Sequence, residues 1–172
     1  MDFRVRPLRR GDVKQVIANY YLRYEEVERN PDLGLSMQEG KPTMKSELEW
    51  AKRLLKDIRQ RNAIATVAIV GKKIVGMADV RTETIMERQH VGSVGVAINE
   101  GYRSMGIGTA LMKDLVKRSK GRFEILVLDV MSINKAAMGL YKKLGFKVYG
   151  TLPKGYMRQG RRIDHTLMYL RP

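Results

Sequence analysis

The chain has 172 residues, of which 44% are hydrophobic and 30% are charged, a balance typical of a single globular domain over residues 1–172. It contains no cysteine, which excludes disulfides, thiolate metal sites and a covalent thioester on the protein itself. No run of about 18 apolar residues and no charged-then-apolar leader occurs, so we expect a cytoplasmic protein that does not cross a membrane.

The net charge of +15 and the pI near 10.2 are high for a domain of this size. The lysines and arginines are spread along the chain and never form a block of five or more. Such a positive field would attract an acidic cofactor, a nucleic acid or a ribosome surface. A generally solvated basic surface explains the charge equally well.

The N-terminal residues predict one strand and one helix. Apolar and basic residues alternate over residues 3–8, which predicts a strand, and Pro7 favours a position at the sheet edge. Asp12 is a predicted N-cap for an amphipathic helix over residues 12–29. Asn30-Pro31 then ends this helix.

A second helix is predicted after a loop over residues 31–42, which contains several glycine and proline breaks. Thr43 is its expected N-cap, and the helix reaches about residue 60. The predicted apolar stripe consists of Met44, Leu48, Ala51, Leu55 and Ile58.

The rest of the chain reads as strands and two further helices, which makes the fold class α/β or α+β. Gly71-Lys72 predicts the tight turn of a hairpin. Polar loops are expected over residues 83–89 and 150–160. Strands are predicted at 64–70, 73–82, 90–98, 123–130, 146–149 and 164–170, and helices at 109–120 and from Asn134 to a C-cap at Gly145.

Gly106 and Gly108 lie between the predicted strand 90–98 and the helix that follows it. The first N–H groups of a helix have no partner within the helix, and the helix dipole adds partial positive charge there. Glycines let a phosphate approach the backbone closely, and Arg103 adds a full positive charge. This segment therefore predicts a site for a pyrophosphate.

Two common phosphate motifs do not fit. A dinucleotide fingerprint needs a third glycine where Leu111 stands, and a P-loop needs Lys-Ser/Thr where Ile107-Gly108 stands. The remaining pattern, Arg103-x-x-Gly106-x-Gly108, resembles the acetyl-CoA motif of the GNAT superfamily of N-acetyltransferases. An ordinary strand–loop–helix junction remains the alternative.

A second block strengthens this resemblance. Residues Asn134 to Phe146 match the family's Asn-x-x-Ala-x-x-x-Tyr-x-x-x-Gly-Phe pattern, one crossover strand after the glycine loop. The tail from Gly160 to Met168 is similar to the closing hairpin of many members, so the resemblance covers nearly the whole chain. Taken alone, Asn134 could simply cap its helix and Tyr141 could simply pack against its neighbours.

The resemblance implies a central mixed, mostly antiparallel sheet of about seven strands flanked by four helices, with a parallel β-α-β crossover at the cofactor site. It also implies direct transfer of an acetyl group from acetyl-CoA to a primary amine within a ternary complex, with Tyr141 as the general acid that protonates the departing thiolate. The cofactor-binding residues that it implies are Val96, Ala97 and Ile98 for pantetheine, Arg103, Ser104, Met105, Gly106, Ile107, Gly108 and Thr109 for the pyrophosphate, and Asn134, Ala137 and Tyr141 beside the cofactor arm.

The general base is the least defined group. Many relatives carry a glutamate three residues before the position of Val96, where this chain has Ser93. His90 and Glu83 are candidate bases, and a water chain is another. Two isolated histidines, His90 and His165, without paired carboxylates argue against a metal site.

Residues 24–49 hold seven acids and three bases inside this basic chain, and in the family this region walls the acceptor side. Tyr24, Glu25 and Glu28 are the candidate acceptor residues. We therefore expect a cationic acceptor, such as a small amine, a polyamine or a peptide amine; the polyamine, phosphinothricin and ribosomal-protein acetyltransferases of the family are the corresponding types. Charges on a solvated helix surface would give the same composition.

Two other functions stay open at this point. A non-catalytic CoA-binding regulatory protein on the same fold would account for the missing strand glutamate. A basic nucleic-acid-binding module would account for the charge, although no helix-turn-helix or aromatic strand signature is present. Contact with a ribosome or nucleic acid and a homodimer are further candidate interactions.

Overall fold

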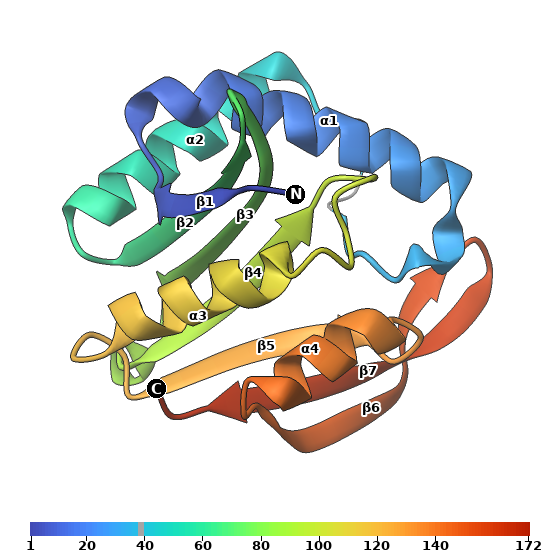
Figure 1. The fold of residues 1–172 in the computed structure, drawn as a ribbon. Helices are drawn as coiled ribbons and strands as arrows, with labels where there is room; N and C mark the ends of the chain where they lie inside the picture. The colour runs from blue at the N-terminus through green and yellow to red at the C-terminus, as the bar shows by residue number, and fades with distance from the viewer. Residues whose placement is uncertain (38–39) are drawn as a thin grey trace.

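The computed structural model describes residues 1–37 and 40–172. Within them the chain forms one seven-stranded sheet in the order β1-β2-β3-β4-β5-β7-β6, flanked by four α-helices (Figure 1). The strands are β1 Arg4–Pro7, β2 Ala63–Val70, β3 Lys73–Thr82, β4 Val91–Ile98, β5 Ile125–Met131, β6 Lys147–Arg158 and β7 Arg161–Leu170. The α-helices are α1 Val13–Arg29, α2 Met44–Arg59, α3 Ile107–Ser119 and α4 Lys135–Lys143, and short 3-10 helices occupy Arg10–Asp12, Pro31–Leu33 and Met86–Arg88.

The sheet is antiparallel except for the β4–β5 pair, which α3 connects. A parallel pair of neighbouring strands requires a crossover connection of this kind. The predicted mixed, mostly antiparallel sheet of seven strands, four helices and one parallel crossover is confirmed.

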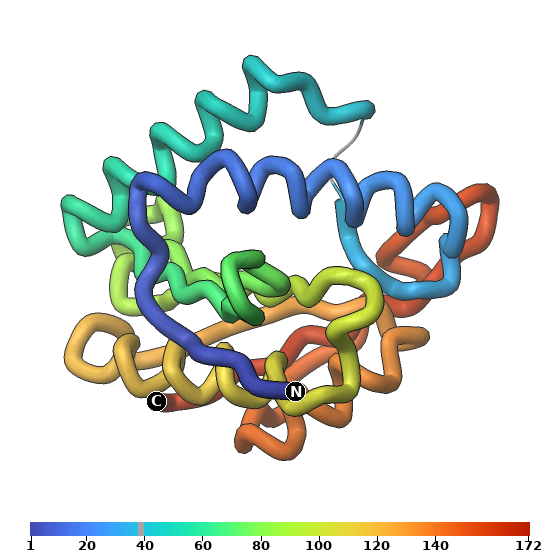
Figure 2. Tube along the Cα trace, turned by 45° about the horizontal axis from the view of Figure 1, so that its top comes forward, coloured from blue at the N-terminus to red at the C-terminus, as the bar shows by residue number. Residues whose placement is uncertain are grey.

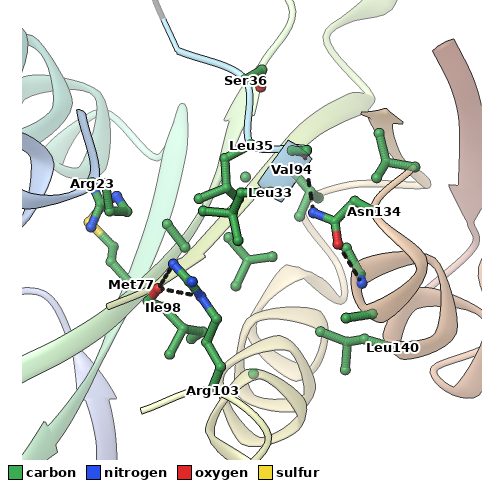
Figure 3. A pocket seen from close by; sticks show the side chains of 18 of the residues that line it. Arg23, Leu33, Leu35, Ser36, Met77, Val94, Ile98, Arg103, Asn134 and Leu140 are labelled. Carbon is green, nitrogen blue, oxygen red and sulfur yellow. Dashed lines mark hydrogen bonds between the residues drawn. The ribbon is translucent and has the colours of Figure 1, made fainter. Parts of the chain in front are cut away.

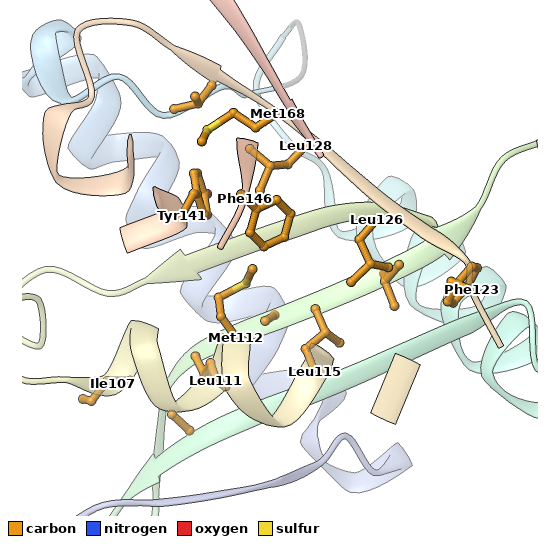
Figure 4. Packing of buried hydrophobic residues seen from close by; sticks show 14 of the residues in the cluster. Ile107, Leu111, Met112, Leu115, Phe123, Leu126, Leu128, Tyr141, Phe146 and Met168 are labelled. Carbon is orange, nitrogen blue, oxygen red and sulfur yellow. The ribbon is translucent and has the colours of Figure 1, made fainter. Parts of the chain in front are cut away.

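The helices form two layers, with α1 and α2 on one face of the sheet and α3 and α4 on the other (Figures 1 and 2). Val16 of α1 and Leu54 of α2 pack in one apolar cluster against the face of β2 and β3 that these two helices cover. The opposite cluster joins α3, α4, β5 and β7 (Figure 4). Its labelled members are Ile107, Leu111, Met112, Leu115, Phe123, Leu126, Leu128, Tyr141, Phe146 and Met168.

The helix caps follow the sequence in part. The Thr43 side chain accepts a hydrogen bond from Ser46 N at 3.1 Å, which confirms it as the N-cap of α2. Asp12 is the N-cap residue of α1, as predicted, but its side chain makes no capping bond, because its carboxylate accepts from both Arg6 Nη atoms at 2.7 Å and from Arg9 N at 2.7 Å. The C-cap of α4 is Leu144, and Gly145 follows it at φ +92°.

The predicted apolar stripe of α2 was wrong in part. Met44 and Leu48 are 57% and 41% exposed, whereas Glu47, Ala51 and Leu54 are buried. The predicted and observed stripes share Ala51 and Ile58, but Glu47 and Leu54 are buried where Leu48 and Leu55 were predicted, so the buried face is rotated by part of a turn around the helix axis. The rotation brings Glu47 to the interior, and this matters for the site.

The segment over residues 150–160, predicted as a loop, belongs to the edge strand β6. The β6–β7 register shifts between Val148 and Gly150 and again between Leu152 and Tyr156. Bulges of this kind accommodate extra residues, and an edge strand tolerates Pro153 because its missing N–H is not needed for a ladder. The chain reverses only at Gln159 and Gly160, both at positive φ.

The feature that positions the site is a separation of β4 from β5. β4 pairs with β3 along Gly92–Ile98, but with β5 only along Val91–Ser93. From residue 94 onward β4 has no partner on its β5-facing edge, while β5 keeps its pairing with β7 on its other edge up to Met131. An open backbone edge inside a sheet is a ready site for an extended ligand.

Candidate active site

A cleft of roughly 700 Å³ opens where β4 and β5 separate. This volume falls in the range of ordinary small-molecule sites. One wall comes from α1, α2, β3 and the segment 33–37, and the other from the end of β5, the loop before α3 and the start of α4 (Figure 3). Val94 to Ile98 of β4 run along the floor between the two walls.

The glycine loop ends in a helix N-terminus that faces this cleft. Gly106 is the N-cap of α3 at φ +80°, and the first backbone bond of the helix joins Ala110 N to Gly106 O at 3.0 Å. The N–H groups of residues 107–109 therefore precede the helical ladder and have no intrahelical acceptor. A Cβ at Gly106 would meet no atom within 4 Å, so open space lies in front of these donors. This is the geometry of an anion site.

Most of the predicted cofactor residues line the cleft together. They are Val96, Ala97, Ile98, Arg103, Ser104, Gly106, Gly108, Thr109, Asn134, Ala137 and Tyr141. Met105 and Ile107 are not part of the lining. Met105 is exposed, and Ile107 points into the apolar core beneath the loop, so only its backbone N–H can serve an anion.

Arg103 is engaged within the protein. Its guanidinium forms an ion pair with Glu26 of α1, with one hydrogen bond of 2.6 Å, and donates to the Ile98 carbonyl at 3.0 and 3.2 Å. Figure 3 shows the two bonds to Ile98. The pair ties α1 to the glycine loop, and an anion here would rely on the backbone N–H groups and the helix dipole.

We expect the Arg103–Glu26 pair to stabilise the fold. Arg103→Met leaves the Glu26 carboxylate, whose side chain is 6% exposed, without its partner, so the free energy of unfolding should fall by about 2–4 kcal/mol. The double variant Glu26→Met/Arg103→Met should recover most of that loss. Urea denaturation measures both values.

The control for this prediction joins the same two elements. Arg29 of α1 pairs with Glu100 at 3.0 Å, but these side chains are 65% and 63% exposed. Arg29→Met should therefore change the unfolding free energy by less than about 1 kcal/mol. Equal losses in Arg29→Met and Arg103→Met would contradict the role of burial.

Asn134 and Tyr141 have structural roles as well as positions in the cleft. The Asn134 side chain accepts from Ala137 N at 3.0 Å, which caps α4, and donates to the Gly34 carbonyl at 3.2 Å. Gly34 has φ +69°, and a Cβ there would lie 2.7 Å from Asn134 Cβ. The glycine thus lets the segment before α2 sit directly on α4.

Tyr141 is buried against Phe146, with 5.9 Å between ring centroids, yet it lines the cleft. Burial, with a smaller contribution from the Asp129 charge, raises the pKa of Tyr141 to about 12. The phenol therefore stays protonated at neutral pH. Its hydroxyl makes no hydrogen bond to any residue that the structure describes, so it is available to a ligand.

The two candidate bases from the sequence do not reach the cleft. His90 lies in an exposed turn before β4, and Glu83 pairs with Arg88 at 3.7 Å. Neither residue is part of the cleft lining. Both precede the paired part of β4, whereas the cleft begins where that pairing ends.

The structure instead brings in three carboxylates that the sequence analysis did not single out, namely Glu47, Asp79 and Asp129. Asp79 interrupts the apolar strand β3 and pairs with Arg81 at 2.8 Å. Asp129 interrupts the apolar strand β5 in the same way. A single acid within an otherwise buried strand was the signal that could have identified both.

Asp129 is held by side chains from β6 and β7. It accepts a hydrogen bond from the Tyr156 hydroxyl, and His165 Nε2 lies 3.3 Å from Asp129 Oδ2. The β4–β5 register pairs Ser93 with Val127, and its continuation places Asp129 across the gap from Gly95. Asp129 and Tyr141 therefore both border the gap between the strands.

The acceptor wall is not as acidic as the sequence suggested. Tyr24, Glu25 and Glu28 lie on α1 but do not line the cleft, and Glu26 is paired with Arg103. From the acidic residues of 24–49 that the structure describes, Glu47 alone lines it. Two arginines, Arg23 and Arg81, line it as well.

The described part of the chain shows neither a cluster of metal ligands nor a membrane-spanning helix. Across residues 1–37 and 40–172, no three His, Asp or Glu side chains are grouped to hold a metal ion. In the same residues, no helix combines the length and the apolar character needed to cross a bilayer.

The glycine loop and the Asn134 block fall inside a single family match. The acetyltransferase (GNAT) family model matches residues 24–146, which is more than half of the chain. The chain belongs to the GNAT family of acetyltransferases. In this GNAT protein the family's two sequence blocks, the glycine loop and the start of α4, both line the cleft described above.

Two curated GNAT relatives illustrate the range of similarity. The L-amino acid N-acetyltransferase AaaT of Escherichia coli is 28% identical over 100 residues, which cover 57% of this chain and 62% of that protein. An N-alpha-acetyltransferase of Sulfurisphaera tokodaii is 36% identical over 102 residues, which cover 52% of this chain and 60% of that protein. The matches thus span about three fifths of these relatives' length.

Solved structures show that the similarity in fold extends over the whole chain. The ribosomal-protein-alanine N-acetyltransferase of Brucella melitensis has a TM-score of 0.82 at 20% identity and covers 98% of this chain and 99% of that one. A phosphinothricin acetyltransferase from Sinorhizobium meliloti, solved in complex with acetyl-CoA, has a TM-score of 0.83 at 21% identity and covers 99% and 89%. At these identities the likeness establishes the GNAT fold alone.

Proposed function

We propose that this protein is an acetyl-CoA-dependent N-acetyltransferase that transfers an acetyl group to a primary amine. The observation that carries the proposal is the open edge of β4, which leads directly to the unpaired N–H groups at the start of α3. Such an edge suits the amide groups of a pantetheine arm, and such a helix end suits a diphosphate. The solved relative with acetyl-CoA, whose fold this chain shares, supports the same ligand.

The proposed cofactor contacts follow from this placement. Val96, Ala97 and Ile98 lie along the open edge for pantetheine, and the N–H groups of residues 107–109 face the diphosphate. The Ile98 carbonyl already accepts from Arg103, and the Ala97 backbone faces β3, so the backbone of Val96 offers the free groups for the ligand. Ala137 and Asn134 border the arm from α4.

The chemistry requires one group to receive a proton and one to supply it. An amine with a pKa near 10.4 must lose a proton before its nitrogen can attack the thioester carbon, and the C–S bond then breaks to leave a thiolate. We assign proton acceptance to Asp129 and proton donation to Tyr141, because they border the same gap and the Asp129 charge acts on the phenol. The products are the acetylated amine and the free thiol.

The first test is binding of acetyl-CoA followed by thiol release. Acetyl-CoA should raise the Tm of the protein, and amines should trigger release of the thiol. A rise in Tm with no thiol release by any amine would favour a non-catalytic CoA-binding protein. Salt-sensitive retention of DNA without a Tm shift would favour a nucleic-acid-binding module.

Gly106→Ala tests the anion site. A methyl group at φ +80° is strained, and it projects into the open space before the helix N-terminus, so acetyl-CoA should bind about 10- to 100-fold more weakly. Isothermal titration calorimetry measures this change. The free energy of unfolding should fall by only about 1 kcal/mol.

Gly121→Ala is the matched control. Gly121 lies beyond the other end of α3, also at positive φ (+73°), and a methyl group added there would likewise meet no atom within 4 Å. The variant should lose similar stability and keep its affinity for acetyl-CoA. Equal affinities for Gly106→Ala and Gly121→Ala would exclude the diphosphate site.

A further inference from the structure

Arg23 makes no close ion pair with a carboxylate of a described residue. It lies on α1, lines the cleft and stacks over the Tyr20 ring at 5.9 Å, and its Nη1 donates to Asn99 Oδ1 at 3.4 Å. No carboxylate of a described residue lies within 4.0 Å of it, because Glu26 pairs with Arg103 and Asp79 pairs with Arg81. Burial lowers the pKa of Arg23, which reflects the cost of keeping this charge away from water.

Two carboxylates of the cleft also lack a lysine or arginine partner within 4.0 Å. The buried Glu47 side chain makes no hydrogen bond or ion pair with a residue that the structure describes, and burial raises its pKa while Arg23 opposes the rise. Asp129 is bonded to the neutral Tyr156 hydroxyl, and His165 lies beside it. Among the described residues, the cleft therefore offers one arginine and two carboxylates that form no arginine–carboxylate ion pair within 4.0 Å.

The remaining surface of this part of the cleft is apolar. Val16 of α1, Trp50 of α2 and Met77 of β3 line it, and Leu33 and Leu35 approach from the segment before α2. In Figure 3, Arg23 lies beside Met77, on the opposite side of the view from Asn134. The cation is thus placed next to an apolar surface on the α1 side.

We propose that the acceptor is a free amino acid with an apolar side chain, whose carboxylate binds Arg23. This specificity rests on the proposed acetyltransferase function. Glu47 and Asp129 face the ammonium group, and Trp50 and Met77 contact the side chain. A polyamine would add positive charge beside Arg23, and a peptide N-terminus would bring no carboxylate to neutralise it.

The test compares acids with their amides. L-methionine and L-leucine are assayed against methioninamide and leucinamide, with spermidine and a short basic peptide included. The acids should show a kcat/KM about 10- to 100-fold higher, as expected for one charge-assisted bidentate contact. The amide amine loses its proton more readily, so without a carboxylate site the amides would react at least as fast.

The variant Arg23→Gln tests whether Arg23 causes the preference for acids over amides. The variant should lose about 10- to 100-fold in kcat/KM on the acids and keep its rate on the amides, whereas Arg23→Lys should recover part of the loss. Arg29→Gln, on the exposed face of the same helix, is the control and should behave as the parent does.

The outcomes separate this inference from the function on which it rests. Equal kcat/KM on acids, amides and polyamine, or an equal loss on acid and amide in Arg23→Gln, overturns the carboxylate site and leaves the acetyltransferase in place. With CoA present, the acids should also raise the Tm more than the amides do. A larger Tm rise with the acids, but no thiol release from acetyl-CoA, would overturn the acetyltransferase function and retain the carboxylate site. If Arg23→Gln does not fold, the comparison of acids with amides in the parent protein still tests the carboxylate site.

Discussion

Tyr141→Phe is expected to lower kcat by about 10²- to 10³-fold, while the affinity for acetyl-CoA changes by less than about threefold. The reason is that the ring and its packing against Phe146 remain, and only the hydroxyl that we assign to protonating the thiolate is lost. The raised pKa of about 12 keeps that hydroxyl protonated in the parent. Thiol release at saturating substrates and calorimetric titration with acetyl-CoA measure the two quantities.

The stability of this variant is its internal check. Because the Tyr141 hydroxyl makes no hydrogen bond to a described residue, its removal should leave the free energy of unfolding unchanged or slightly higher. Tyr149→Phe, on the exposed edge strand β6, serves as the control and should keep parental kcat. A Tyr141→Phe enzyme as fast as the parent would remove Tyr141 from the chemistry and leave it a packing residue.

Asp129→Asn is expected to lower kcat by about 10²- to 10³-fold. The amide keeps the size of the side chain and can still accept from the Tyr156 hydroxyl, but it cannot take a proton from the acceptor ammonium. Binding of acetyl-CoA should change little, because the diphosphate site lies at the other end of the cleft lining, at the start of α3. Initial rates across an acceptor series measure this loss.

The control for Asp129→Asn is the same substitution at a carboxylate outside the cleft. Asp114→Asn, which removes a partly exposed carboxylate that pairs with Arg118 on α3 and does not line the cleft, should leave the rate unchanged. If Asp129→Asn retained a rate within about threefold of the parent, Asp129 would not be the base. Glu47 and Asp79, whose pKa values burial raises, would then be the carboxylates to replace next.

The order of elements was predictable because its signals are local. Thr43 caps α2, the turn after β2 makes a hairpin, and Gly106 begins α3, each through residues within a few positions of one another. The same holds for the glycine loop and the Asn134 block, whose spacing carries the family resemblance. For these features, the residues that determine the backbone conformation are neighbours in the sequence.

The predictions were wrong where contacts between distant parts of the chain determine the local structure. The stripe of α2 was misplaced in part because only the packed sheet shows that Glu47, not Leu48, turns inward. The segment over residues 150–160 looked like a loop, yet pairing with β7 holds it as a bulged strand. Glycine and proline content does not distinguish a bulge at a sheet edge from a loop.

The charges at the cleft could not be derived from composition. The excess of acidic residues over residues 24–49 favoured a cationic acceptor. In the structure, however, Glu26 forms an ion pair with Arg103, and Glu25 and Glu28 lie outside the cleft. Arg23, from just before that segment, enters the cleft instead. Which charges remain free depends on pairs between residues far apart in sequence.

The amino-acid order alone was enough to predict the family, the succession of strands and helices, the glycine loop with its helix N-terminus, and the presence of Tyr141 and Asn134 beside it. The folded chain was needed to show where β4 leaves β5, that Arg103 is bound to Glu26, and that Glu47, Asp129 and Arg23 meet in one cleft. The difference is one of range, because caps, turns and helix ends depend on neighbouring residues. Burial and ion pairing depend on contacts that form only when the whole sheet and its two helical layers come together.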